Sequence, residues 1–332
     1  MARIVLGMAM PHTAMQVTSP EAWLAGGERD RKNPDLWFRN RHVTFDELVE
    51  LRRTEGLGPH MTLDERKSRG ERVTRALDEL RRVYRENKPD VAVVIGKDQK
   101  EVFSEPTPSL AVFSGAELPN VPPQRAAFAP DAAVTYPGHP ELARHLIEAL
   151  EAEGFDMAEV SKMPPNAWMQ QTPIVQHAYS FVYHQIMGNE PPPSVPVFMN
   201  TFFPPNQPSI GRSIAFGRAL VRAILAWDSD KTVGIFASGG LSHFICDEEL
   251  DAEFLACFKT FDFERLAKID ERSFQSGTSE VKLFVPVLVA LAELECEMRL
   301  IDYVPVYRSE AGSGEGLGYL YGVIQDSRGA VQ

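Results

Sequence analysis

Short apolar segments rich in β-branched residues recur along the chain and predict buried strands. Most of them end in a glycine or a polar residue, as strands do in a mostly parallel sheet that is covered on both faces. The clearest segments span residues 2–8, 90–96, 195–201 and 232–238. Residues 212–227 lie between the last two and have the pattern of a helix. This half of the chain therefore predicts a strand–helix–strand unit.

Helical spacing predicts three further helices. Leucines recur at this spacing over residues 139–153, with Pro140 in the opening turn and Gly154 at the end. The highly charged stretch 19–88 contains two more helical patterns, over residues 44–54 and 62–86, and Thr44 is suited to cap the first of them. These helices form an insertion between the first two strands.

The elements together predict an α/β fold: a single domain over residues 1–325 with a central, mostly parallel sheet flanked by helices. The helical insertion is placed at 19–88 and a C-terminal tail at 326–332. The proline-rich stretch 164–205 is expected to form loops that line a cleft. The glycine cluster at 312–318 precedes a predicted strand, not a helix, so we interpret it as a flexible turn and not as a dinucleotide fingerprint.

Composition and charge exclude several classes of protein. The chain has 332 residues, and its 34 basic and 46 acidic side chains give a net charge of −12, which argues against nucleic-acid binding. Its three cysteines have no CxxC spacing, so neither a disulfide framework nor a structural zinc site is expected, and a cytoplasmic location fits. The longest apolar run, at 283–292, is too short to cross a membrane and contains Pro286.

Two histidines follow predicted strands and are candidates for chemistry. Ligands of open α/β sheets bind at the carboxyl ends of strands. His12 follows the first strand, and His243 ends the segment Ser238-Gly-Gly-Leu-Ser-His243, in which paired glycines let the backbone approach a ligand closely. A single loop histidine is more often exposed or capping than catalytic. Two such histidines at one sheet edge leave a functional and a structural role equally open.

An ordered set of motifs resembles the class III extradiol ring-cleavage dioxygenase family, which includes the catalytic subunit of protocatechuate 4,5-dioxygenase and the gallate and 3-O-methylgallate dioxygenases. The set comprises His12 after the first strand, Tyr136-Pro-Gly-His139-Pro-Glu-Leu-Ala, His177 shortly before Gly188, Pro196-Val-Phe-Met-Asn200 with Pro204-Pro205, and Ala237-Ser-Gly-Gly-Leu-Ser-His243. The resemblance extends over nearly the whole chain to about residue 325, apart from the charged insertion.

The resemblance implies a non-haem Fe(II) held by two histidines and one carboxylate, with open positions for a catecholic substrate and O2. The family's first ligand corresponds to His12. Its acid/base histidine corresponds to His243, and a histidine that contacts substrate corresponds to His177. The implied function is extradiol cleavage of a catecholic or gallate-like aromatic acid.

Two ligand positions of that family differ in this chain. The family's Asn-Asp-His triplet is Lys97-Asp98-Gln99, so Gln99 is expected to line the substrate pocket, because an amide is a poor ligand for Fe(II). Glu280 is the candidate carboxylate, although another register would put Lys282 there. His60 from the insertion is the candidate for the missing imidazole.

The alternative is a metal-free homologue of the same fold. Such a chain would be a non-catalytic partner subunit, or a hydrolase or lyase that uses the retained histidines. Gln99 and Lys282 support this alternative.

Further residues are assigned to the substrate. Arg212 and Lys282 are candidates for holding a substrate carboxylate, and His184, two helical turns after His177, is a candidate to share its face. The expected partners are a small aromatic acid and O2, with no nucleic acid and no membrane. We expect a homodimer, and a small second subunit is an open possibility.

Overall fold

The computed structural model describes residues 1–332 except 35, 122–131, 164–172 and 326–332. The strands are β1 Arg3–Pro11, β2 Trp37–Phe38, β3 Arg41–His42, β4 Val91–Gly96, β5 Leu110–Phe113, β6 Glu117–Asn120, β7 Val134–Pro137, β8 Ala158–Val160, β9 Ser194–Met199, β10 Thr232–Gly239, β11 His243–Ile245, β12 Arg299–Tyr307 and β13 Ser313–Val323. The α-helices are α1 Ala25–Asp30, α2 Phe45–Arg52, α3 Leu63–Glu86, α4 Pro140–Ala152, α5 His177–Phe181, α6 Ile210–Ala226, α7 Glu248–Thr260, α8 Phe263–Leu266 and α9 Val281–Glu293.

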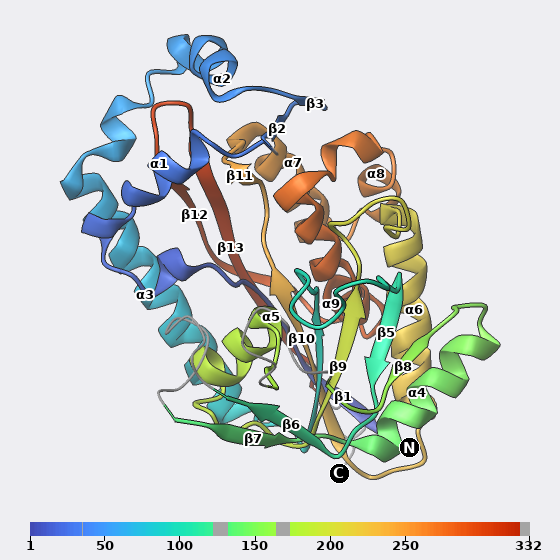
Figure 1. The fold of residues 1–332 in the computed structure, drawn as a ribbon. Coiled ribbons are helices and arrows are strands. Elements are labelled where there is room, and N and C mark those ends of the chain that lie inside the picture. The colour runs from blue at the N-terminus through green and yellow to red at the C-terminus, as the bar shows by residue number, and fades with distance from the viewer. Residues whose placement is uncertain (35, 122–131, 164–172, 326–332) are drawn as a thin grey trace.

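Within the described residues, nine strands form a central sheet whose middle is parallel. Its order is β11-β13-β1-β10-β4-β9-β5-β8, and β12 pairs with β13. Strands β1, β10, β4 and β9 run parallel to one another, whereas β13 is antiparallel to β1 and β5 is antiparallel to β9. The predicted α/β class, with a mostly parallel sheet flanked by helices, is confirmed (Figure 1).

Both faces of the sheet are covered, which explains the continuous apolar runs of the strands. In β4, Val91, Val93 and Ile95 face the core that contains α4, α6 and α9, while Ala92 and Val94 face the core with α3 and α5. Figure 1 shows α3 on one side of the sheet, with α4, α6 and α9 on the other. Among the described residues, no helix combines the length and the apolarity that a membrane span requires.

Most predicted elements are confirmed, with ends that shift by a few residues. The four predicted strands correspond to β1, β4, β9 and β10, and the predicted helices correspond to α2, α3, α4 and α6. Thr44 forms a capping box with Glu47 at the start of α2, as its position predicts. The two charged helices lie between β1 and β4, where the insertion was expected.

The predicted turn holds only for the first glycine of the cluster, because Gly312 lies between β12 and β13 with φ +76°, whereas Gly314, Gly316 and Gly318 lie inside strand β13. A Cβ on Gly316 would collide with the carboxylate of Asp251, and one on Gly314 would lie 2.9 Å from the carbonyl carbon of Val306. Glycine is therefore needed for close packing of this strand, not for a turn.

The proline-rich stretch is more regular than expected. Besides the predicted strand β9, it contains α5 and a π-helical turn at Val182–Ile186. Its segment 164–172 and the predicted tail 326–332 lie outside the described residues.

Candidate functional site

The parallel strands β1, β10 and β4 bring polar residues to one edge of the sheet. His12 directly follows β1 and Lys97 directly follows β4, while Ser238 lies near the end of β10 between them. The register pairs Pro11 with Gly239, so the ends of β1 and β10 are level. His12 Nδ1 lies 3.1 Å from Ser238 Oγ, which fixes the imidazole at this edge.

Glu280 is the centre of the cluster. Its carboxylate forms an ion pair with the ammonium of Lys97, and each side chain is only 1% exposed. The other Glu280 oxygen lies 3.4 Å from His12 Nε2, and His243 Nε2 lies 3.7 Å from the carboxylate. One buried carboxylate is thus surrounded by one ammonium and two imidazoles.

The charges of this cluster explain its protonation. Burial alone would raise the pKa of Glu280, but the charge of Lys97, followed by His12 and His243, outweighs burial and lowers the pKa well below its usual range. Burial lowers the pKa of His12 well below its ordinary value, and the attraction of Glu280 offsets only part of this effect. At neutral pH, Glu280 is therefore ionised and His12 is neutral.

The short 3₁₀ helix Ser276–Glu280 carries Glu280 and also positions His243. Thr278 Oγ1 accepts a hydrogen bond from the His243 amide at 3.1 Å, and Gly277 packs directly against the His243 ring and backbone. On the other side, Asp251 of α7 accepts hydrogen bonds from the amide and the hydroxyl of Ser242, at 2.7 and 2.6 Å. The backbone on both sides of the His243 imidazole is therefore held.

His177, at the start of α5, forms a hydrogen-bonded dyad with Glu101. His177 Nδ1 lies 2.7 Å from Glu101 Oε2, and the His177 amide donates to the same carboxylate at 3.2 Å. Burial would raise the pKa of Glu101, but His177 outweighs it and the pKa is lowered. The His177 ring lies edge-to-face against His12, with centroids 4.7 Å apart, and this contact joins the dyad to the cluster.

A cavity of about 510 Å³ opens onto these residues. Its lining includes His12, His177, His243, Lys97 and Glu280, together with residues of the insertion. Trp23 and Met15 contribute apolar surface, while Arg29, Asp30 and Arg308 contribute charge. The volume is within the range of small-molecule sites.

The cations of the cavity differ in their partners. Arg308 is bound by Asp30 at 2.8 Å and by Glu315 at 3.2 Å, and Lys97 is paired with Glu280. Arg29 is exposed, and its guanidinium has no ion pair or hydrogen bond with another described residue. It is therefore the cation best able to bind a ligand's negative charge.

The structure brings together five of the residues that the sequence singles out. His12, Gln99, His177, His243 and Glu280 all line this cavity, although they are separated by up to 268 positions in the chain. Of the two candidates for the carboxylate position, Glu280 lies next to His12, whereas Lys282 pairs with Glu271.

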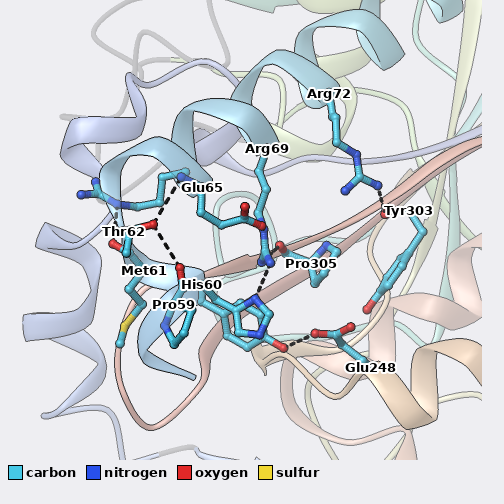
Figure 2. A network of polar contacts seen from close by, with 12 residues as sticks. Pro59, His60, Met61, Thr62, Glu65, Arg69, Arg72, Glu248, Tyr303 and Pro305 are labelled. Carbon is cyan, nitrogen blue, oxygen red and sulfur yellow. Dashed lines mark hydrogen bonds and ion pairs between the residues drawn. The ribbon is translucent and has the colours of Figure 1, made fainter. Parts of the chain in front are cut away.

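His60 is not with them, because the structure places it away from the residues that line this cavity. It lies in the 3₁₀ helix Gly58–Met61, where its Nδ1 is 2.6 Å from the guanidinium of Arg69 and its ring packs 5.1 Å from that of Tyr307. Figure 2 shows His60 between the start of α3 and strand β12, where Arg69 also contacts Pro305. The structure therefore gives His60 its partners outside the candidate site, and its role as a metal ligand stays a prediction.

The other predicted substrate contacts also lie elsewhere. Arg212 stacks on Phe155 and donates to the Gly154 carbonyl at 2.9 Å. Lys282 is buried, pairs with Glu271 and donates to the Pro208 carbonyl at 3.0 Å. His184 lies in the π-helical turn, 3.0 Å from Asn189. Each of these side chains has a protein partner, and the structure brings none of the three to this cavity.

Sequence reasoning missed Lys97, Glu101 and Arg29. Lys97 follows a predicted strand, so the rule that selected His12 could also have selected it. Glu101 comes from the same loop, but its pairing with His177 joins residues 76 positions apart and has no signal in the sequence. Arg29 is one of many arginines in the insertion and could be recognised only from its place in the cavity.

The residues at this edge do not fit the Fe(II) that the resemblance implies. Among the described residues, no group of three or more His, Cys, Asp or Glu side chains is arranged to hold a metal ion. The carboxylate is instead paired with an ammonium, which has no lone pair to offer a metal. Gln99, at the position of the missing imidazole, is a poor substitute.

The comparison with protein families identifies the chain's relatives. The family model described as the catalytic LigB subunit of aromatic ring-opening dioxygenase matches residues 58–307. This range includes Lys97, His177, His243 and Glu280, whereas His12 and Arg29 lie before it.

Proposed function

The chain belongs to the family of catalytic LigB subunits of aromatic ring-opening dioxygenases, and from this premise we propose that its cavity binds a small hydroxylated aromatic acid and takes a proton from a ring hydroxyl. A catecholic or gallate-like acid is the substrate class that we propose. Trp23 and Met15 would contact the ring, and the polar end of the cavity would receive the hydroxyls.

The observation that carries this proposal is the His177–Glu101 dyad beside His12. When Nδ1 of His177 donates to the carboxylate, Nε2 is the ring atom that accepts a proton. The proton moves from the hydroxyl oxygen to Nε2, which leaves a phenolate and an imidazolium, and Glu101 stabilises the imidazolium. His243 is the group that we propose returns a proton.

Arg29 is proposed to hold the carboxylate of the aromatic acid. It is the cavity cation without an acidic partner among the described residues, and a guanidinium binds a carboxylate with two parallel hydrogen bonds. The insertion would thus contribute substrate selectivity, while the sheet edge contributes the proton-transfer groups.

Two reactions are open to a site of this kind. Family membership supports the first, extradiol ring opening with O2 at Fe(II). Lys97 would have to move away from Glu280 before this carboxylate could bind the metal. The Lys97–Glu280 ion pair supports the second, a metal-independent lyase- or hydrolase-type reaction that uses the same histidines. We favour the metal-independent reaction on the strength of this contact.

The experiment is to compare the binding of protocatechuate with that of catechol, which lacks the carboxylate. Arg29→Ala should weaken protocatechuate binding by roughly tenfold, the effect of one exposed charged hydrogen-bond pair, and leave catechol binding unchanged. Arg53→Ala is the matched control, because Arg53 is also exposed and forms an ion pair with Glu50, 3.4 Å away, outside the residues that line the cavity. An equal loss for both ligands, or no loss, would contradict the role of Arg29. Absence of binding of either ligand to the wild type would contradict the proposed substrate class.

A further inference from the structure

The Lys97–Glu280 pair is almost completely buried. Neither side chain takes part in the proposed proton transfer. Both side chains are 1% exposed, and the Lys97 ammonium lies 4.8 Å above the ring of Phe202. A buried ammonium is costly unless a carboxylate compensates it, so the two groups depend on one another. The pair neutralises its own charge without any bound ion.

We propose that Lys97 is a built-in cation that takes the charge-neutralising place of a divalent metal at this sheet edge. The inference deepens the proposed function, on which it rests for the identity of the cavity as the active site. A divalent ion bound by Glu280 would have to displace the Lys97 ammonium or lie next to it. A metal ion and an ammonium that share one carboxylate in a buried site repel each other strongly. As long as Lys97 is present, the site should not take up a metal.

The remaining donors define what Lys97 excludes. His12 Nε2 and His243 Nε2 lie 3.4 and 3.7 Å from the Glu280 carboxylate. Two imidazoles and one carboxylate suit Fe(II), Co(II) and Zn(II). Lys97 directly follows β4, and the register places it level with the ends of β10 and β1. An imidazole in its place would therefore extend the same cluster. Lys97→His should therefore uncover a metal site that the wild type lacks.

The test is a titration of the full chain with Co(II), followed by visible absorption and by equilibrium dialysis. We expect the wild type to bind no stoichiometric Co(II). Lys97→His should bind one Co(II) per chain, with an affinity at least roughly a hundredfold higher than that of the wild type, the scale on which ligand-shell changes act. Combining His12→Ala with Lys97→His should abolish the gain.

Two variants serve as matched controls. Lys97→Arg keeps the positive charge at the site and should bind no more Co(II) than the wild type. Lys88→His makes the same residue change at an exposed position outside the cavity and should also behave like the wild type. If Lys97→His does not fold, Lys97→Gln replaces it, because loss of the ammonium alone exposes Glu280 to the metal.

Two results would overturn the inference. One is tight stoichiometric Co(II) binding by the wild type, and the other is a folded Lys97→His or Lys97→Gln that binds no more Co(II) than Lys88→His. The titration contains no aromatic ligand. If the wild type binds both Co(II) and protocatechuate, the role of Lys97 is rejected and the proposed substrate class stands. If the wild type does not bind protocatechuate, the proposed substrate class is rejected, whatever the Co(II) titration shows.

Discussion

Glu280 is the residue on which the charges of the site depend. It has a positively charged neighbour in Lys97 and polar neighbours in His12 and His243; Glu280, Lys97 and His12 are buried, and His243 is 12% exposed. In such a place the loss of one charge is expensive, because the other charge stays buried without compensation. The loss of both charges is cheaper, because no buried charge is left.

Glu280→Gln is expected to lower the free energy of unfolding by about 3–5 kcal/mol, the usual cost of breaking a buried pair. Lys97→Gln should cost a similar amount, and the double variant should cost clearly less than the sum of the two. The measurement is chemical denaturation of the four proteins. Strict additivity would show that the two side chains do not form a coupled pair.

The same carboxylate predicts a pH dependence. Its pKa is lower in the folded protein than the value of about 4.3 expected in the unfolded chain, so folding favours the ionised form. The stabilisation is fully present above the unfolded pKa and is lost as the pH falls toward the folded pKa. The difference in unfolding free energy between the wild type and Glu280→Gln should thus be constant near neutrality and shrink below about pH 4. A difference that grows on acidification would have the wrong sign.

At the scale of elements, the 3₁₀ helix Ser276–Glu280 links the Glu280 carboxylate to His243. Gly277 allows this contact. A Cβ at this position would lie 2.6 Å from the carbonyl carbon of His243, and closer still to its oxygen and ring. The helix and the His243 strand could not stay this close with any larger residue.

Gly277→Ala is therefore expected to destabilise the fold by about 1–3 kcal/mol, as overpacking does. It should also weaken the binding of the aromatic acid, because His243 moves. Gly58→Ala is the control, since a Cβ there has no neighbour within 4 Å. The measurement pairs thermal unfolding with protocatechuate binding. A Gly277→Ala protein that matches Gly58→Ala in both would refute the close approach.

At the scale of the whole molecule, the sequence was sufficient to predict the parallel sheet and the edge at which its site lies. Buried parallel strands have continuous apolar runs, and β1, β4, β9 and β10 were identified by them. His12 and His243 follow from the rule that ligands bind at carboxyl strand ends. These signals are local, which is why sequence reasoning reaches them.

The partners of the side chains were not predictable in the same way. Lys282 and Glu280 are two residues apart on one segment, yet Glu280 faces the cavity and Lys282 faces Glu271. His60 packs on Tyr307 and Arg212 donates to Gly154, and only the tertiary structure brings these partners near. Long-range pairs such as Lys97 with Glu280 and His177 with Glu101 leave no periodicity in a single sequence.

The central claim is that the site deprotonates a ring hydroxyl with its own residues while Lys97 occupies the place of a metal. The most direct measurement is the ultraviolet difference spectrum of protocatechuate on binding to EDTA-treated protein at pH 7 without oxygen. An unperturbed phenolic hydroxyl such as that of tyrosine has a pKa of about 10, so free protocatechuate should keep its hydroxyls protonated at this pH. We predict a catecholate band with the metal-free wild type and its loss in His177→Gln. A band that appears only after Fe(II) is added would contradict the account.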